Sequence, residues 1–361
     1  MRPSHAIVLA FLISGCSAAA DATAAASASA SMTVSAQSSP SPSAGATEPD
    51  WSALPRLDES VTARVPITGG WSVLMGAAPV AYGSLWISNG SEAGEPPRLR
   101  RLDRETMEVT ATIDLGGAAD VFPPDAYGAF YSAHGIWVPL MSQKAVVLVD
   151  PTTNSVSGRI EVDATPYGLL EDGDDLWITD FGNSEVLRVD IPTGEERLRV
   201  SIPEPTGMAS GPEGLWVIEH ETGFVTRLDP VTGEELARVQ VGGRPGIVLG
   251  LGSVWASSSD EKTVSRIDPA TNAVIATIVL PSHPSGAAIA GGSLWLTVGP
   301  QRGACERTSY LVRIDPATNE VDGILDVPCA GSPVSDGARV WVNSGEEDAV
   351  WILSVEAGGR P

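Results

Sequence analysis

The chain is poor in basic residues, in histidine and in recognisable catalytic motifs, and each shortage excludes a class of function. Lys and Arg total 22 against 45 Asp and Glu. The resulting net charge of −23 argues against nucleic acid or anionic lipid as a partner, because phosphate binding requires a basic surface. Four histidines leave few groups for proton transfer near neutral pH. Gly-x-Ser-x-Gly, His-Glu-x-x-His and Cys-x-x-Cys are absent, and no glycine-rich turn leads into a helix, so no complete nucleophile, zinc or phosphate motif is present.

The first 50 residues predict an export signal followed by a flexible tether. Arg2 precedes an apolar stretch, 6–13, that is too short to span a bilayer. Ile13-Ser14-Gly15-Cys16 resembles a bacterial lipobox, so we expect residues 1–15 to be a lipoprotein signal peptide and Cys16 to carry lipid. Residues 16–50 are nearly all Ala, Ser, Thr and Pro and cannot bury enough apolar surface to fold. We therefore expect an exported protein, anchored only through lipid to the outer face of a bacterial membrane.

Residues 51–361 predict a single all-β domain built from a repeat. Seven tryptophans open short apolar runs and are 39 or 40 residues apart in the middle of the chain: Trp86, Trp137, Trp177, Trp216, Trp255, Trp295 and Trp341. Short strands with this period are typical of propeller blades. One tryptophan per repeat in a constant context favours packing between blades over a ligand cage. The pattern predicts a seven-bladed β-propeller with four-stranded antiparallel blades.

One repeat unit shows how the strands are separated. Residues 246–249, 253–256, 263–268 and 273–280 are expected to be its four strands. Pro269 and Asn272 predict the hairpin between the last two, since proline presets φ and asparagine tolerates the left-handed conformation. In five repeats an Arg stands two residues before the Asp that precedes this turn, as in Arg266 and Asp268, which indicates a scaffold feature.

The two ends of the domain predict how the ring closes. The last repeat ends without an outer strand, whereas residues 61–66 match outer strands but have no inner strands before them. We therefore expect this N-terminal strand to complete the last blade, which removes an open sheet edge. Cys305 and Cys329 lie in two loops that should emerge on the same face, so a disulfide between them is predicted, with two free thiols as the alternative.

Departures from the repeat identify candidate binding residues. The loop that leads into each blade and the loop after each Trp strand should lie on one face, around the mouth of the central channel (the mouth face). Convergent polar groups around such a mouth form the default binding site. The candidates in these loops are Tyr127, Tyr167, Asp180, Phe181, Glu204, Thr206, Glu219, His220, Arg244, His283, Arg302 and Asn343. Of these, His220 and His283 are the candidates for proton transfer.

The chain resembles the NHL, YVTN and streptogramin (virginiamycin B) lyase group of propellers over about residues 60–355. The motifs that carry this are Pro-x-Gly before the first strand (166–168, 205–207 and 284–286), the Leu-Trp strand, and the Arg-Ile-Asp-Pro-Ala-Thr-Asn turns at 266–272 and 313–319. The resemblance to the lyases implies a magnesium ion and a mouth histidine as base. Glu204 and Glu219 would then hold the metal, but Thr206 stands where those lyases have histidine, so the base would be His220 or His283.

Two functions remain open from the sequence. The first is a non-catalytic propeller lipoprotein, displayed on the envelope without a cofactor, that binds a peptide, glycan or protein at the mouth face. The second is a magnesium-dependent lyase that opens a cyclic depsipeptide or a similar substrate by C–O elimination. The tether and the incomplete catalytic set favour the binding module. We expect a monomer.

Overall fold

The computed structural model describes residues 51–66, 80–88, 96–117, 126, 128–300 and 308–355. These residues contain two short 3₁₀-helices, η1 (Trp51–Ala53) and η2 (Asp58–Ser60), and otherwise β-strands and turns. Within them, no helix has the length and apolarity needed to cross a membrane. The leader, Cys16 and the tether lie outside the described residues, so their roles stay predictions.

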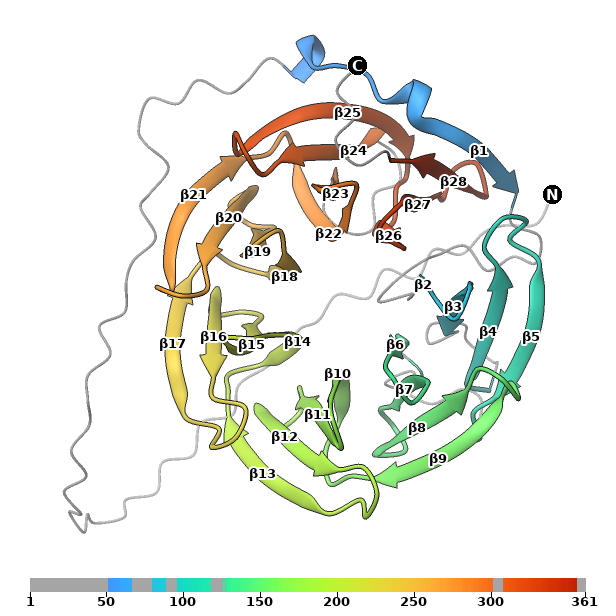
Figure 1. Cartoon of the computed structure of the whole chain (residues 1–361), viewed down its shortest axis with the longest axis vertical. Coiled ribbons are helices and arrows are strands. Elements are labelled where there is room, and N and C mark those ends of the chain that lie inside the picture. The colour runs from blue at the N-terminus through green and yellow to red at the C-terminus, as the bar shows by residue number, and fades with distance from the viewer. Residues whose placement is uncertain are drawn as a thin grey trace, which may run out of the picture. The chain divides into compact units, whose positions relative to one another are not determined.

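Seven four-stranded antiparallel sheets surround a common axis as the blades of a propeller (Figure 1). Blade 1 consists of β2 (Val80–Ala81), β3 (Ser84–Ser88), β4 (Arg98–Asp103) and β5 (Val109–Asp114). Blade 2 consists of β6 (Phe130–Tyr131), β7 (Ile136–Leu140), β8 (Ala145–Asp150) and β9 (Ser155–Glu161). Blade 3 consists of β10 (Pro166–Asp172), β11 (Asp175–Asp180), β12 (Glu185–Asp190) and β13 (Glu196–Ser201). Blade 4 consists of β14 (Pro205–Gly211), β15 (Gly214–Glu219), β16 (Phe224–Leu228) and β17 (Glu235–Gln240).

The remaining blades repeat this order from the axis outward. Blade 5 consists of β18 (Pro245–Gly250), β19 (Ser253–Ser258), β20 (Thr263–Asp268) and β21 (Ala273–Val279). Blade 6 consists of β22 (His283–Ala290), β23 (Ser293–Gly299), β24 (Thr308–Asp315) and β25 (Glu320–Pro328). Blade 7 consists of β26 (Val334–Ser335), β27 (Arg339–Ser344), β28 (Ala349–Ser354) and β1 (Val61–Pro66). The predicted seven-bladed propeller is confirmed.

The N-terminal strand closes the ring as predicted. Strand β1 pairs antiparallel with β28, with Val65 opposite Val350 and Arg64 opposite Trp351. The Arg64 guanidinium also lies 3.8 Å from the centroid of the Trp351 ring. A segment from the start of the domain thereby covers the edge that the last blade would otherwise expose.

The seven repeated tryptophans fill the spaces between blades, each at 2% exposure or less. Trp216 of blade 4 packs with Val254 and Ala256 of blade 5. Trp255 of blade 5 in turn packs with Leu294 and Leu296 of blade 6. Neighbouring blades cover both faces of the strand that carries each tryptophan, so β15 and β19 are buried along their whole length. This explains the uninterrupted apolar runs 215–218 and 254–256 within these strands, which do not alternate with exposed polar residues.

In blades 1, 3, 4 and 5 the repeated arginine joins its blade to the next, whereas Arg313 pairs with Asp322 within blade 6. Arg227 of blade 4 lies 5.8 Å from the Trp216 ring centroid and donates to the Pro269 carbonyl (3.0 Å) and Asn272 Oδ1 (2.9 Å) in the turn of blade 5. The corresponding turns are contacted in the same way by Arg101, Arg188 and Arg266. Asp229, two residues after Arg227, instead accepts the backbone N–H groups of its own turn. The Arg and Asp of the motif therefore have separate structural roles.

Replacing Arg227 by alanine should lower the free energy of unfolding by about 2–3 kcal/mol, because charged hydrogen bonds across a blade junction and a contact with a buried ring are lost together. Arg159→Ala is the matched control. Its partner Glu161 is 69% exposed, so the change should be under about 1 kcal/mol. Equilibrium denaturant unfolding measures both. Equal effects of the two substitutions would contradict the inter-blade role of Arg227.

Candidate functional site on the mouth face

Four consecutive blades present different polar residues at one structural position. Thr165, Glu204, Arg244 and His283 each directly precede the proline at the start of an innermost strand, in blades 3 to 6 respectively. The surrounding backbone repeats, whereas a hydroxyl, a carboxylate, a guanidinium and an imidazole alternate at this position. The repeated scaffold explains why a proline recurs at this position. It does not explain why the residue before the proline differs from blade to blade.

A chain of hydrogen bonds brings four of the predicted residues together on the mouth face. The His220 N–H donates to the Glu204 carbonyl (3.1 Å), and the Arg244 N–H donates to the His220 carbonyl (3.0 Å). The Ser259 N–H donates to the Arg244 carbonyl (3.4 Å), and the Ser259 carbonyl lies 2.6 Å from His283 Nδ1. These five residues, Glu204, His220, Arg244, Ser259 and His283, form the mouth arc. It runs across blades 4, 5 and 6, which begin with β14, β18 and β22 in Figure 1.

The contact with Ser259 fixes the orientation and tautomer of His283. A carbonyl oxygen only accepts hydrogen bonds, so Nδ1 must carry the proton that it shares with Ser259. In the neutral ring, Nε2 is then the acceptor. His283 is partly buried, and Nε2 is the ring nitrogen that this contact leaves as an acceptor.

The side chains of Arg244 and His220 lie far from their carboxylate partners. Arg244 Nε lies 3.9 Å from Asp260 Oδ1, with both side chains nearly half exposed. His220 Nε2 lies 3.7 Å from Glu221 Oε1, and its side chain is 35% exposed. Exposed pairs at such distances contribute little to stability, so a ligand can replace these partners at small cost.

Glu204 has an unusual local environment. Its backbone is left-handed, with φ of 41°, and its N–H donates to Ser184 Oγ at 3.3 Å. Its carboxylate oxygen Oε2 is buried and has no hydrogen-bond partner among the described residues. Buried polar atoms are normally paired, and such exceptions cluster at functional sites.

An aromatic pair lies at the junction of blades 3 and 4, where Ser184 contacts the Glu204 backbone. The ring centroids of Tyr167 and Phe181 are 6.1 Å apart, and Phe181 is 40% exposed. Phe181 and Ser184, the hydroxyl partner of Glu204, lie in the same turn after β11. Thr179 Oγ1, in β11, accepts the Gly168 N–H (2.7 Å) and donates to the Thr206 carbonyl (2.8 Å), so it links the innermost strands of blades 3 and 4.

Four predicted binding residues lie in the interior: Asp180, Glu219, Asn343 and Thr206 are 0%, 1%, 3% and 9% exposed. Asp180 Oδ1 accepts the N–H of Thr165 (3.0 Å) and of Asn183 (3.2 Å), which ties the leading loop of blade 3 to the turn after β11. In blade 5 Ser258 Oγ likewise accepts an N–H of the following turn, from Glu261 (3.1 Å), and it donates to the Gly243 carbonyl of the leading loop (3.0 Å). In both blades, the polar residue at the end of the Trp strand therefore connects the loop before the blade to the turn after that strand.

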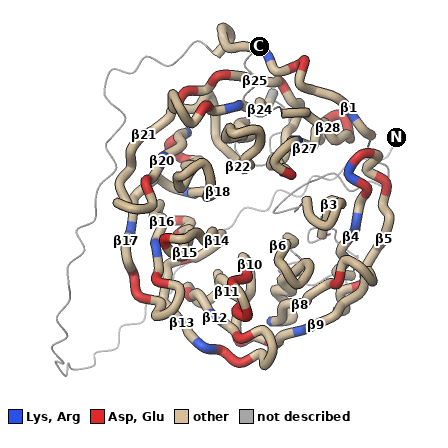
Figure 2. Tube along the Cα trace, viewed as in Figure 1, with Lys and Arg blue, Asp and Glu red and all other residues tan. Residues whose placement is uncertain are grey.

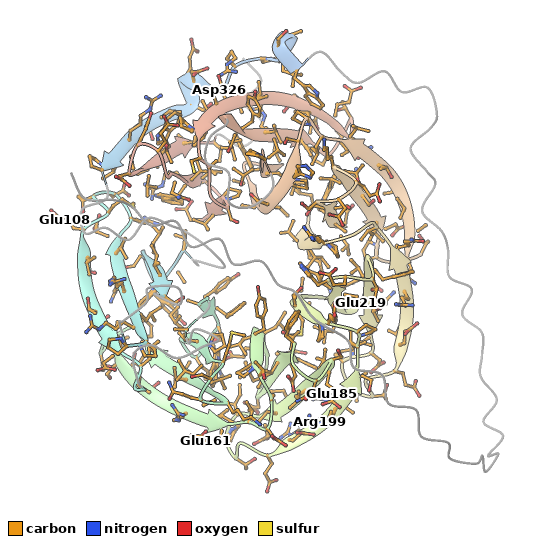
Figure 3. All side chains as sticks on the ribbon, turned by 180° about the vertical axis from the view of Figure 1, so that it is seen from behind. Glu108, Glu161, Glu185, Arg199, Glu219 and Asp326 are labelled. Carbon is orange, nitrogen blue, oxygen red and sulfur yellow. The ribbon has the colours of Figure 1, made fainter. Side chains whose placement is uncertain are left out.

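Glu219 is held by protein donors. Its oxygens accept hydrogen bonds from Arg238 (2.8 and 2.6 Å), Thr226 (2.5 Å) and Thr222 (2.7 Å). Figure 3 labels Glu219 among the side chains of the ring. Burial opposes ionisation, but these hydrogen bonds and the charge of Arg238 outweigh it and hold the pKa of the carboxyl below its ordinary value.

This arrangement does not fit Glu219 to the magnesium role that the resemblance implies, because its oxygens already serve an arginine and two hydroxyls. Nowhere in the described ranges do three His, Cys, Asp or Glu residues gather as a metal-binding group. The magnesium site stays a prediction that these residues do not favour.

Some predictions fall outside the described residues, namely those for Tyr127, Arg302 and Cys305. The predicted disulfide between Cys305 and Cys329 therefore stays a prediction. Sequence reasoning missed Ser184 and Ser259, which position Glu204 and His283. Ser259 contributes its backbone carbonyl, so its side chain gave no signal.

Fold and arc together define the class of this protein: a seven-bladed β-propeller with varied polar groups on its mouth face. Among solved structures it is similar to a streptogramin B lyase, at 17% identity and a TM-score of 0.61 over 81% of this chain and 97% of that chain. It is also similar to a chain of a mitotic checkpoint complex (10% identity, TM-score 0.64, 82% and 94% covered) and to the Pan2 WD40 domain of Neurospora crassa (10%, 0.61, 87% and 92%). Comparison with family models and with curated proteins gave no match. At these identities the likeness shows the fold alone.

Proposed function

We propose that this chain is an envelope-anchored β-propeller lipoprotein that binds a peptide, glycan or protein at its mouth face. The observation that carries the proposal is the mouth arc. Its residues, which bear a carboxylate, two imidazoles and a guanidinium, are linked across consecutive blades by backbone hydrogen bonds and by His283 Nδ1. A merely solvated rim needs no such variety at one repeated position. Half-exposed polar groups on a rigid scaffold suit recognition, because the propeller holds them in place before the ligand arrives.

The location is part of the proposal and is supported by the sequence. The leader, the lipobox-like residues 13–16 and the Ala/Ser/Thr/Pro-rich residues 16–50 suit a domain displayed outside the cell. The high negative charge, which is spread around the ring in Figure 2, suits solubility there and disfavours contact with anionic headgroups.

The alternative function, a C–O lyase, is favoured by one observation. His283 has its Nδ1 fixed by a carbonyl, which leaves Nε2 as an acceptor that could take a proton from a substrate. The occupied carboxylate of Glu219 weighs against the metal-assisted form of this reaction. Turnover of a bound ligand, lost in His283→Ala, would favour the lyase over the binding module.

Arg244→Ala and His220→Ala should each weaken ligand binding by about tenfold or more, since each removes a charged or polar contact at the centre of the arc. The assay screens residues 51–361 against peptide and glycan panels and measures each hit by calorimetry. Arg104→Ala is the matched control, because Arg104 pairs with Asp336 on the face opposite the mouth. The proposal is wrong if hits bind equally well to the arc variants, or if no hit is found.

A further inference from the structure

One oxygen of the Glu204 carboxylate, Oε2, is buried without a donor among the described residues. An unmet buried acceptor destabilises the folded state, and more so when it is charged. The guanidinium at the equivalent position of the next blade, Arg244, has Asp260 as its ion-pair partner, at 3.9 Å. A donor brought by a ligand would reduce this destabilisation, and a cationic donor would reduce it most.

The neighbouring side chains suit a cation and not merely any donor. Tyr167 and Phe181 form a tilted aromatic pair at the same blade junction, and Phe181 presents 40% of its surface to solvent. The faces of aromatic rings carry negative potential and attract ammonium groups within about 6 Å of the centroid. A carboxylate and two aromatic rings at one blade junction form a combination that selects a positively charged ligand group.

The net charge of the whole chain also favours a cationic ligand. Its net charge of −23 raises the local concentration of cations and repels anions. A bare divalent metal is a poorer match than an organic cation, because among the described residues no three His, Cys, Asp or Glu gather to replace its water ligands. An ammonium group needs one carboxylate and gains from apolar ring surface.

We infer that the junction of blades 3 and 4 binds the ammonium group of the ligand, a peptide amino terminus or a quaternary ammonium, between Glu204 and the Tyr167–Phe181 pair. This inference rests on the proposed function, because it assigns one subsite of the same mouth face. Glu204 holds the charge, and the aromatic pair provides the apolar wall. His220 and Arg244 then receive the rest of the ligand along the arc.

Two matched probe pairs test the charge requirement on residues 51–361. Choline and 3,3-dimethylbutan-1-ol share one shape but differ in charge; tri-alanine and N-acetyl-tri-alanine differ in the terminal ammonium. We expect the charged member of each pair to bind at least about tenfold more tightly, as measured by calorimetry or ligand-observed NMR. Equal affinity within both pairs, or no binding of either charged probe, would overturn the inference.

Variants locate the subsite. Glu204→Gln, which keeps the shape, should weaken the charged probes about tenfold or more, and Phe181→Ala should weaken them about three- to tenfold. Glu234→Gln removes the same charge from an exposed turn of blade 4 on the opposite face and should leave affinity unchanged. Thermal melting checks that all three variants fold. Unchanged affinity in Glu204→Gln would overturn the inference even if the charged probes bind.

The two proposals fail in different ways. A panel hit that requires Arg244 and His220 but is indifferent to N-acetylation and to Glu204→Gln would remove the ammonium subsite and leave the binding module intact. Failure of every panel member and every probe to bind would remove both. Charge-selective binding lost in Glu204→Gln would support both together.

Discussion

Replacing Arg238 by methionine is expected to lower the free energy of unfolding by about 2–4 kcal/mol at neutral pH. The substitution leaves the Glu219 carboxylate, which is 1% exposed, without its cationic partner, and an uncompensated buried charge is strongly destabilising. The expected loss is smaller than the largest losses seen when a buried ion pair is broken. The Arg238 side chain is 34% exposed, so water replaces part of the interaction. Equilibrium unfolding in urea measures the difference.

The stability loss caused by Arg238→Met should depend on pH, because Glu219 titrates. In the wild type the pKa of Glu219 is lowered, so its contribution to stability is present above the unfolded pKa, roughly 4.3, and is lost as pH falls through the folded value. In Arg238→Met, burial dominates and raises the pKa, so stability is lost as pH rises. The difference between the two proteins should therefore shrink toward pH 4. A constant difference between pH 4 and 7 would contradict this assignment.

A double variant separates the charge from packing. Glu219→Gln removes the buried charge, so Arg238→Met should cost markedly less in the Glu219→Gln background than in the wild type. Additive effects would mean that the alkyl chain of Arg238, whose guanidinium lies 4.0 Å from the Phe224 ring centroid, matters more than the ion pair.

Removing the N-terminal strand is the second change with a large expected effect. A chain that begins at residue 67 lacks β1, so β28 becomes an open edge and the ring is left unclosed. Loss of one strand's hydrogen-bond ladder and side-chain packing should lower the stability by about 3–6 kcal/mol and promote association through the free edge. Thermal unfolding and size-exclusion chromatography report the two effects.

The control for this deletion is the chain that begins at residue 51, which keeps Leu57 and its hydrogen bond to the Ile324 carbonyl. A synthetic peptide of residues 55–66, added to the shortened chain, should restore part of the stability by pairing with β28. Identical melting of the long and short chains, without association, would mean that the ring does not depend on β1.

The strands of the scaffold could be predicted from the sequence because every repeat shows the same pattern of strand and turn residues. The strand expected at 263–268 is observed at Thr263–Asp268, and the closing strand expected at 61–66 is Val61–Pro66. Tryptophan spacing and proline–asparagine turns reflect local geometry, so the strands and turns can be predicted from them without knowledge of the fold. The partner of Arg227 could not be read in this way, since it lies in the turn of the next blade, and no periodic signal specifies that contact.

The candidate site was predicted less completely, for a related reason. Glu204, His220, Arg244 and His283 were expected on the mouth face, and they lie in one arc. Asp180 and Glu219 were expected there too, but they are buried because loop amides and a neighbouring arginine need acceptors. The sequence gives the position of a polar residue in a loop, whereas its availability to a ligand depends on which backbone and side-chain groups surround it.

The most direct test is an amide hydrogen-exchange footprint of residues 51–361 with and without the tightest ligand from the panel. Our proposal predicts slower exchange in the loops that carry the arc, around residues 204–206, 220–222, 244–246 and 259–261, with the Asp-Pro turns near 230 and 269 unchanged. Protection confined to those turns, or to the outer strands, would contradict ligand binding at the mouth face.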